Sequence, residues 1–301
     1  MDTKVEVKNK KPSKFISRWS KYTKQEKIIL TCVHLFLAIM AVWVILPMVY
    51  VLVNSLKTVY DFNDNPMSLP SIWKFENYLT ALTIEYRNTT VLKMFINSMI
   101  FAITFSFANI AASCMLAYVI AKFNFRGKKF LYSLAIIVQI IPIFGTGSAS
   151  YLLVDSLGIM DNIWLLWITA ASGFDYTFLL MHSYFENVSW EYSEAAQIDG
   201  AGNWFIFLQI MIPMVSPAIL PFWLSAVVGL WSDYMTPMLY LQYTPTLASG
   251  VYNLKERAPF VSGGTPAYMA TLIVSSVPMI ILFVFTQKAL FSISMEGGLK
   301  G

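Results

Sequence analysis

The chain has 301 residues, of which 57% are hydrophobic and 13% are charged, with a formal net charge of +4 and a mean hydropathy of +0.59. This composition is too apolar for one soluble core and predicts a protein whose solvent is a lipid bilayer. The sequence has no G-x-x-x-x-G-K-[ST] motif, so we do not expect the chain to bind and hydrolyse ATP through a phosphate loop.

Residues 1–27 are predicted to form a basic cytoplasmic tail. The apolar run that follows comes too late and is too long for a cleaved secretory signal. At helical spacing, four apolar side chains face away from three basic ones: Phe15, Ile16, Trp19 and Tyr22 against Lys14, Arg18 and Lys21. The tail is interpreted either as a short helix at the level of the lipid headgroups or as a plain basic segment that sets topology. Its charge is expected to meet anionic lipid and not nucleic acid.

Six stretches have the roughly 20 residues that are needed to cross a hydrocarbon core about 30 Å thick. The first, second, third and fifth carry no charge, and the fourth includes Asp175. The predicted spans are Ile28–Asn54, Phe95–Ala121, Phe130–Val154, Ile163–Tyr184, Trp204–Trp231 and Tyr268–Phe291. The predicted fold is an all-α integral membrane protein, with residues 28–301 as a single six-helix domain.

Lysine and arginine predict the orientation, because basic residues near helix ends tend to stay cytoplasmic. With both termini inside, 15 of the 21 basic residues fall in inner segments and 6 in outer ones. One inner loop, residues 186–203, has no Lys or Arg and carries only Glu186, Glu191, Glu194 and Asp199. A loop that departs from the charge rule is expected to answer to another constraint, such as a docked protein.

This loop also predicts a short helix from Trp190 to Asp199. Ser189 is a plausible N-cap, Glu191 suits the helix dipole in the first turn, and Gly200 can take the left-handed position that ends the helix. Asn203 is expected to cap the helix that follows. About ten residues are too few for a stable isolated helix, so the segment must pack against something. The plain alternative is an interfacial helix whose alanines only favour helix formation.

Glu194-Ala195-Ala196-Gln197-Ile198-Asp199-Gly200-Ala201, followed by Trp204, Phe207, Ile210 and Pro213, resembles the EAA loop of permease subunits of bacterial ABC importers. Other segments are similar to the carbohydrate, maltose-type branch of that family. They are Phe95-Ile96-Asn97-Ser98, Ala117-Tyr118, Ala121-Lys122-Phe123, Phe125-Arg126-Gly127, Ile140-Ile141-Pro142, Trp231-Ser232-Asp233-Tyr234 and the tail Gly297-Gly298-Leu299-Lys300-Gly301. Ser193 and Gln197 replace an acidic and a basic residue that the family often has.

The resemblance implies the type I ABC importer permease fold, with a family-like core over about 91–292 and a coupling loop at 186–203. It also implies a multi-pass protein of the bacterial cell membrane that works with a second homologous permease, two ATPase subunits and an extracellular solute-binding protein. ATP and magnesium would be bound by the ATPases, so this chain would hold no cofactor and be no enzyme. The residues implied to contact the ATPase are Trp190, Glu191, Glu194, Ala195, Ala196, Ile198, Asp199, Gly200 and Ala201.

Within the spans, Pro213, Pro217 and Pro221 recur every four residues, which removes backbone hydrogen bonds along one stripe. The stripe is interpreted either as a bending gate or as curvature for packing. Asp175, expected about 12 residues into the fourth span, is a candidate for the substrate pathway together with Trp231 and Asp233. Its alternative is a hydrogen-bonded structural carboxylate.

No metal site is expected, because Cys32 and His34 are too few ligands and His182 is isolated. Three rivals to a sugar permease remain. A permease of the same superfamily could carry a non-sugar solute such as a peptide. An ion-coupled secondary transporter would need paired intramembrane charges and repeats that the sequence does not show. A membrane enzyme would need a catalytic constellation in the spans.

Overall fold

The computed structural model describes residues 22–140 and 146–296. In the second range it describes side chains only for residues 147–287. The predicted tail helix around Phe15, the segment with Pro142 and the residues 297–301 therefore lie outside the described part. The chain divides into two units, Met1–Val53 and Asn54–Gly301.

The first unit consists of most of α2 (Lys24–Ser55). A capping box begins this helix, since the Glu26 carboxylate accepts from the Thr23 N–H at 2.8 Å and the Thr23 hydroxyl accepts from the Glu26 N–H at 3.3 Å. No residue of its most apolar 18-residue window is buried. A helix that is apolar on all sides and exposed suits a lipid environment.

The second unit begins with α3 (Val59–Asp64), α4 (Glu76–Thr83) and a hairpin of β1 (Glu85–Tyr86) and β2 (Thr89–Thr90). The strands pair antiparallel with Glu85 opposite Thr90. Arg87 and Asn88 turn the chain with φ of 49° and 58°, the conformation that a two-residue hairpin loop of type I′ requires.

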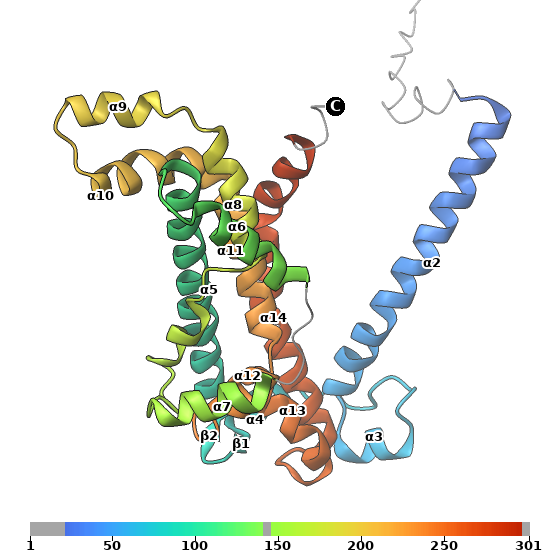
Figure 1. Cartoon of the computed structure of the whole chain (residues 1–301). Helices are drawn as coiled ribbons and strands as arrows, with labels where there is room; N and C mark the ends of the chain where they lie inside the picture. Colours follow the sequence, from blue (N-terminus) through green and yellow to red (C-terminus); the bar gives the residue numbers. More distant parts are fainter. Residues whose placement is uncertain (1–21, 141–145, 297–301) are drawn as a thin grey trace, which may run out of the picture. The chain divides into compact units, whose positions relative to one another are not determined.

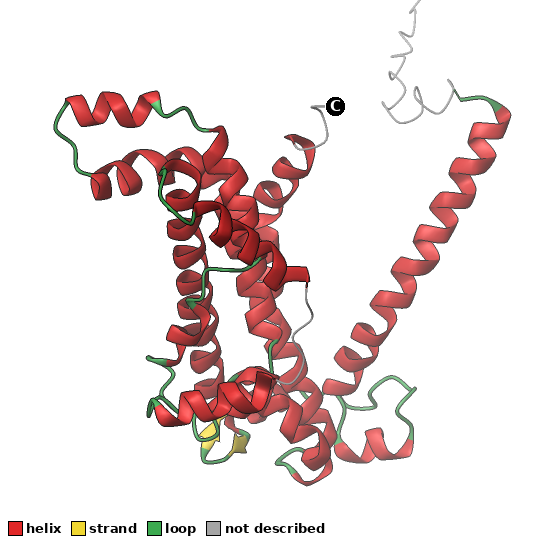
Figure 2. Ribbon diagram, in the orientation of Figure 1, coloured by secondary structure: helices red, strands yellow, loops and turns green. Residues whose placement is uncertain are grey.

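Three long helices carry this unit: α5 (Val91–Lys122), α11 (Ile212–Ser232) and α14 (Gly264–Glu296). They run side by side in Figure 1, and the ribbon diagram in Figure 2 shows helix almost throughout. Shorter elements complete the unit. They are α6 (Lys128–Ile140), α7 (Thr146–Ser156), the 3₁₀ helix η1 (Leu166–Ala170), α8 (Tyr176–Asn187), α9 (Glu191–Ile198), α10 (Asn203–Phe205), the π-helix η2 (Ile206–Met211), α12 (Met235–Tyr240), α13 (Leu247–Leu254) and the 3₁₀ helix η3 (Lys255–Phe260).

Four of the six predicted spans are continuous helices of sufficient length and hydropathy within the described residues: 24–55, 91–122, 203–232 and 264–287. The fourth is not a single helix, and the third is described only on either side of 141–145. Residues 130–154 form α6 and α7 on either side of 141–145, and residues 163–184 contain η1, a turn and then α8. The helical class is confirmed and the fourth predicted span is not one uninterrupted helix, while the count of six membrane-spanning helices stays a prediction.

The fourth segment is interrupted because Gly173 favours a turn and Asp175 begins the next helix. The high hydropathy of the segment gives no sign of either. Gly173 has φ of +69°, and a Cβ there would lie 3.2 Å from the Ala112 carbonyl oxygen of α5. Asp175 is the N-cap of α8, not a residue inside a helix, so the prediction that it lies about 12 residues into the span is wrong. Only glycine fits that close, left-handed turn at low cost.

The fifth predicted span passes from α10 through the π-helix η2 into α11. Pro213 has no N–H, and in a regular α-helix its ring would crowd the carbonyl four residues earlier. The wider π-turn directly before Pro213 avoids that crowding. α11 then continues as an α-helix through Pro217 and Pro221.

Candidate functional site: the α9 loop and its seat

The short helix predicted within the loop 186–203 is present in the structure. α9 runs from Glu191 to Ile198, with Trp190 and Asp199 as its flanking residues. The Ser189 hydroxyl accepts from the Glu191 N–H at 3.3 Å, which satisfies one of the free donors of the first turn. The N-cap itself is Trp190, which makes no side-chain cap bond, so the predicted N-cap at Ser189 is one residue too early.

The end of α9 is a Schellman motif. The Ala201 N–H donates to the Ala196 carbonyl at 2.9 Å and the Gly200 N–H to the Gln197 carbonyl at 3.0 Å. Gly200 has φ of +83°, as expected for the left-handed residue after the helix. The predicted cap at Asn203 is wrong, because Asn203 is already helical and Gly202 holds the N-cap position of α10. Glycine serves as an N-cap without a side chain.

The residues implied to contact the ATPase divide into two faces. The outward set is exposed and consists of Glu191, Glu194, Ala195, Ile198, Asp199 and Gly200. Ile198 is 86% exposed, which leaves a large aliphatic side chain on an acidic surface. The inward set is half-buried and packs against the core of the unit; it consists of Trp190, Ala196 and Ala201. The outward set offers the larger surface to a partner.

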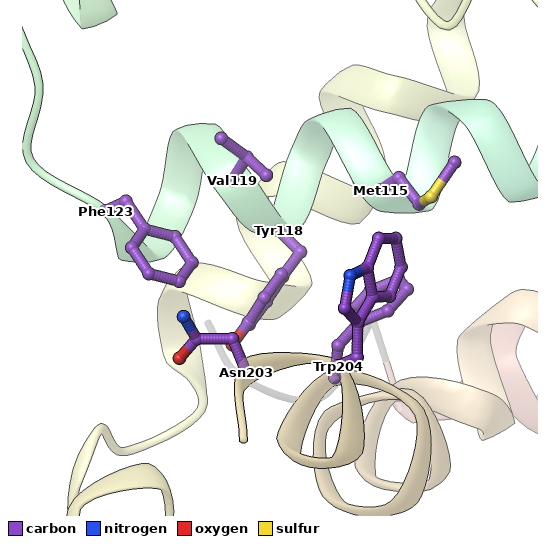
Figure 3. Close-up of a pocket in the computed structure, with 7 residues that line it drawn as sticks. Met115, Tyr118, Val119, Phe123, Asn203 and Trp204 are labelled. Carbon is purple, nitrogen blue, oxygen red and sulfur yellow. The ribbon is translucent and has the colours of Figure 1, made fainter.

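An aromatic cluster at the end of α5 supports this loop. Tyr118 lies centrally, with ring centroids 5.5 Å from Phe123, 5.6 Å from Phe185 and 4.9 Å from Phe207. Phe123 contacts Trp190 at 5.9 Å, edge to face. Figure 3 shows Tyr118 and Phe123 of α5 facing Asn203 and Trp204 around a cavity of about 160 Å³. We call these five rings, those of Tyr118, Phe123, Phe185, Trp190 and Phe207, the seat.

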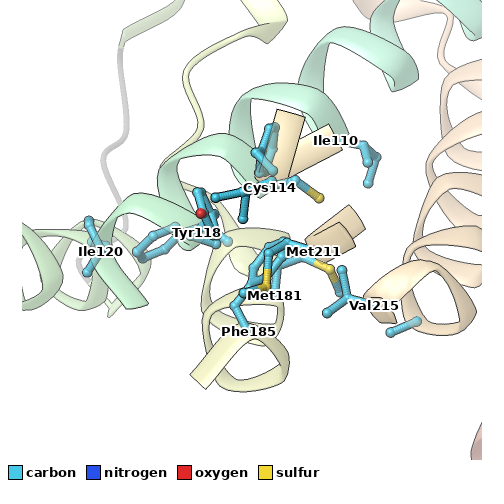
Figure 4. Close-up of a cluster of buried hydrophobic side chains, with 14 residues drawn as sticks. Ile110, Cys114, Tyr118, Ile120, Met181, Phe185, Met211 and Val215 are labelled. Atoms are coloured by element: carbon cyan, nitrogen blue, oxygen red, sulfur yellow. The ribbon is translucent and has the colours of Figure 1, made fainter. Parts of the chain in front are cut away.

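The seat is continuous with a buried core shared by α5, α8 and the η2–α11 segment. Its members pack around Tyr118 (Figure 4) and include Ile110, Cys114, Met181, Met211 and Val215. Both sides of the α9 loop thus rest on the same stretch of α5. The sequence indicated the loop but not this support, because the rings come from four elements, α5, α8, α9 and η2, with Phe123 and Trp190 as cap residues.

The break before α8 is the second polar feature of the unit. Its freed carbonyls accept from side chains of neighbouring helices: Ala170 from Asn109 Nδ2 at 3.5 Å and Phe174 from Gln139 Nε2 at 3.0 Å. Asp175 Oδ1 accepts both from the Ser113 hydroxyl at 2.8 Å and from the Phe178 N–H at 2.9 Å. In a bilayer, irregular backbone survives only with such partners.

The three residues considered for a substrate pathway do not form one site. Asp175 lies beside Ser113, whereas Trp231 packs edge to face on Phe95 and donates its indole N–H to the Ser275 carbonyl at 3.0 Å. Ser113 and Phe95 are 18 residues apart on α5, which is about 27 Å at 1.5 Å per residue. Asp233 Oδ1 accepts from the N–H groups of Met235 and Thr236, so it caps α12. Each of the three has a structural partner.

Trp223 of α11 is a residue that the sequence interpretation missed. The residue borders two apolar cavities of about 460 and 700 Å³, both of which are also lined by α5. Its buried Nε1 has no hydrogen-bond partner among the described residues. No signal in the sequence separates it from the other tryptophans at helical positions.

Residues 109–292 match the family model of the binding-protein-dependent transport system inner membrane component. The chain belongs to this family. The match includes the α9 loop, the break before α8 and all of α11. The resemblance to permease subunits of ABC importers is confirmed, and the chain is a multi-pass protein of the cell membrane.

This chain is 29% identical over 273 residues to the diacetylchitobiose uptake system permease protein NgcG of Streptomyces coelicolor. The match covers 87% of this chain and 86% of that one. This chain is 28% identical to the galactooligosaccharides transport system permease protein GanQ of Bacillus subtilis (89% and 94% covered). It is 26% identical to the maltodextrin transport system permease protein MdxG of the same organism (90% and 96% covered).

Two solved structures share the fold. A chain of a bacterial ABC transporter involved in the import of the acidic polysaccharide alginate matches with a TM-score of 0.72 at 21% identity, covering 89% of this chain and 98% of that one. A chain of a bacterial alginate ABC transporter in complex with an alginate pentasaccharide-bound periplasmic protein matches with a TM-score of 0.57 at 11% identity, covering 89% and 96%. These matches show the type I permease fold.

Proposed function

We propose that this chain is one of two permease subunits in an ATP-driven importer of a sugar or oligosaccharide. The observation that carries the proposal is α9, a capped helix that presents an acidic, exposed face with Ile198 at its centre. The relatives support the substrate class, because those named above are permease proteins of uptake or transport systems for diacetylchitobiose, galactooligosaccharides and maltodextrin.

The proposed partners are a second homologous permease, two ATPase subunits at the α9 end and an extracellular solute-binding protein at the opposite end. In Figure 1, α9 and the α5–α6 turn lie at one end of the second unit, and the β1–β2 hairpin with α12 and α13 lies at the other. The basic α5–α6 turn (Arg126, Lys128, Lys129) at the α9 end supports a cytoplasmic position for that end. We place both termini in the cytoplasm.

The proposed mechanism is a rigid-body movement. Closure of the ATPases on nucleotide would draw α9 and its counterpart together, and the packed second unit would rock between inward-facing and outward-facing states. Solute would cross between the two permeases. This chain contributes no nucleotide site to the cycle and acts only through contacts at its surface.

The test is to purify the assembly in mild detergent through a tag on this chain, and to identify the proteins that accompany it. An Ile198→Asp change buries a charge in the proposed contact and should lower the amount of ATPase retained about tenfold or more, as for a central interface residue. Phe125→Asp, at an exposed aromatic position in the α5–α6 turn, is the matched control. Retention of ATPase by both variants would contradict docking at α9.

The solute class needs a separate measurement. The accompanying binding protein is titrated with maltodextrin, a galactooligosaccharide, diacetylchitobiose and a tripeptide. Binding of one of the sugars supports the proposal. Binding of the tripeptide alone would replace the sugar with a peptide and leave the importer architecture standing.

A further inference from the structure

Lys122, the last residue of α5, lies against the end of a neighbouring helix. Its Nζ donates to the carbonyl oxygens of Val188 and, at 3.5 Å, Glu186. These carbonyls belong to the last turn of α8 and its C-cap, where backbone acceptors have no partner inside the helix and carry partial negative charge. The ammonium therefore lies close to the C-termini of both α5 and α8.

The residue that follows Lys122 contacts the same loop two residues further along the chain. Phe123, the C-cap of α5, packs edge to face on Trp190, two residues after Val188. Between them, Ser189 supplies the hydroxyl that caps the first turn of α9. Lys122 and Phe123, at the end of α5, thus contact Val188 and Trp190, which lie on either side of Ser189.

The chain that leaves α9 returns to the same part of α5. Phe207 packs on Tyr118 at 4.9 Å, and Ala201 packs against the same core. Tyr118 and Lys122 are four residues apart, so they lie one helical turn from each other on one side of α5. Ring packing tolerates sliding, whereas a hydrogen bond from an ammonium fixes a distance and a direction.

We propose that Lys122 is a positioning residue for energy coupling. Its ammonium locks the start of the α9 loop to α5, so that a displacement of α9 moves α5 and the helices packed on it instead of bending the loop. This inference rests on the proposed function for the source of the displacement. The contact between Lys122 and the end of α8 lies within this chain, so it can be tested without any partner.

The first experiment measures cleavage of the full chain in lipid nanodiscs by a Glu-specific protease. The loop suits this enzyme because it holds exposed Glu191 and Glu194 and has no Lys or Arg. Lys122→Met removes the donor at similar length and should raise the cleavage rate in the loop about tenfold, the effect of losing a charged hydrogen bond on local opening. Lys122→Arg keeps donors and should cleave like the wild type.

Lys129→Met is the matched control, because Lys129 is an exposed lysine of α6 near the same end. Unchanged cleavage in Lys122→Met, or equal acceleration in all three variants, would overturn the proposal. Lys122→Leu, which also has no donor, replaces the methionine variant if that protein does not accumulate. Mass spectrometry of the fragments separates cuts at Glu191 and Glu194 from cuts elsewhere.

The second experiment measures solute uptake per ATP hydrolysed by the complex in proteoliposomes. Lys122→Met should lower this ratio about tenfold, as expected for one lost charged hydrogen bond, with ATP hydrolysis and ATPase retention close to wild type. Lys122→Arg should restore the ratio. An unchanged ratio in Lys122→Met overturns the inference, whereas a wild-type chain that retains no ATPase overturns the proposed function instead, with the cleavage result still valid for Lys122.

Discussion

The α9 loop and the segment 163–184 both contain a short helix preceded by a capping side chain, yet they are stabilised by different contacts. In the α9 loop the bond from the Glu191 N–H to the Ser189 hydroxyl and the Schellman bonds at Gly200 and Ala201 join residues at most five apart. In the segment 163–184 the decisive bond joins Asp175 to Ser113, 62 residues away. A pattern in sequence can predict the first kind of element, while the second depends on which helices become neighbours.

The largest effect is expected where the α9 loop meets the tertiary core. Tyr118 is 4% exposed and touches three other rings of the seat. Tyr118→Ala should lower the free energy of unfolding by about 3 kcal/mol or more, as for other buried aromatic truncations. The midpoint of thermal unfolding, followed by size-exclusion chromatography in detergent, reports this change. Tyr118→Phe keeps the ring and should remain close to wild type; equal losses in both variants would contradict a seat built on ring packing.

Gly173 is expected to show the next largest effect, because it combines two constraints. Gly173→Ala forces a Cβ into the left-handed region and to 3.2 Å from the Ala112 carbonyl. Gly158 has a similar φ of +66° with open space around it, so Gly158→Ala isolates the conformational part, about 1 kcal/mol. Gly173→Ala should lower the unfolding midpoint clearly further than Gly158→Ala. Matching shifts would mean that contact with α5 does not stabilise the break.

Asp175 distinguishes a structural carboxylate from a transport residue. Its Oδ1 accepts two hydrogen bonds, which an asparagine oxygen can also accept. Asp175→Ala should therefore cost about 1–2 kcal/mol through loss of the cap, and Asp175→Asn only a few tenths. Solute uptake by Asp175→Asn at normal complex assembly completes the test. Reduced uptake with normal stability would assign the charge a role in transport.

The smallest effects belong to the local signals of the α9 loop. Gly200 has φ of +83°, and a Cβ added there would meet no atom within 4 Å, so Gly200→Ala should cost about 1 kcal/mol from conformation alone. Asn203→Ala should leave stability unchanged, since Gly202 is the N-cap of α10. Circular dichroism melts of the two variants check both values. A loss in Asn203→Ala equal to that of a cap would restore the capping role expected from sequence.

Much of the candidate site was predictable from residues 189–201 alone. Ser189, Gly200 and the small residues between them act within one or two turns, and such signals keep their meaning in any tertiary setting. The division of the proposed coupling residues into an outward and an inward face was not predictable, because Trp190, Ala196 and Ala201 turn inward only where Phe123 and the core of α5 and α8 meet them.

The hydropathy of the chain determined its solvent, its long helices and the existence of a polar loop with its own helix, because these follow from composition and from contacts between near neighbours. Only the tertiary structure decided that the fourth segment is interrupted, that Asp175 is a cap and that Lys122 joins α5 to α8. Broken backbone in an apolar setting is stable only when distant side chains supply its hydrogen bonds, and a linear pattern does not contain that information.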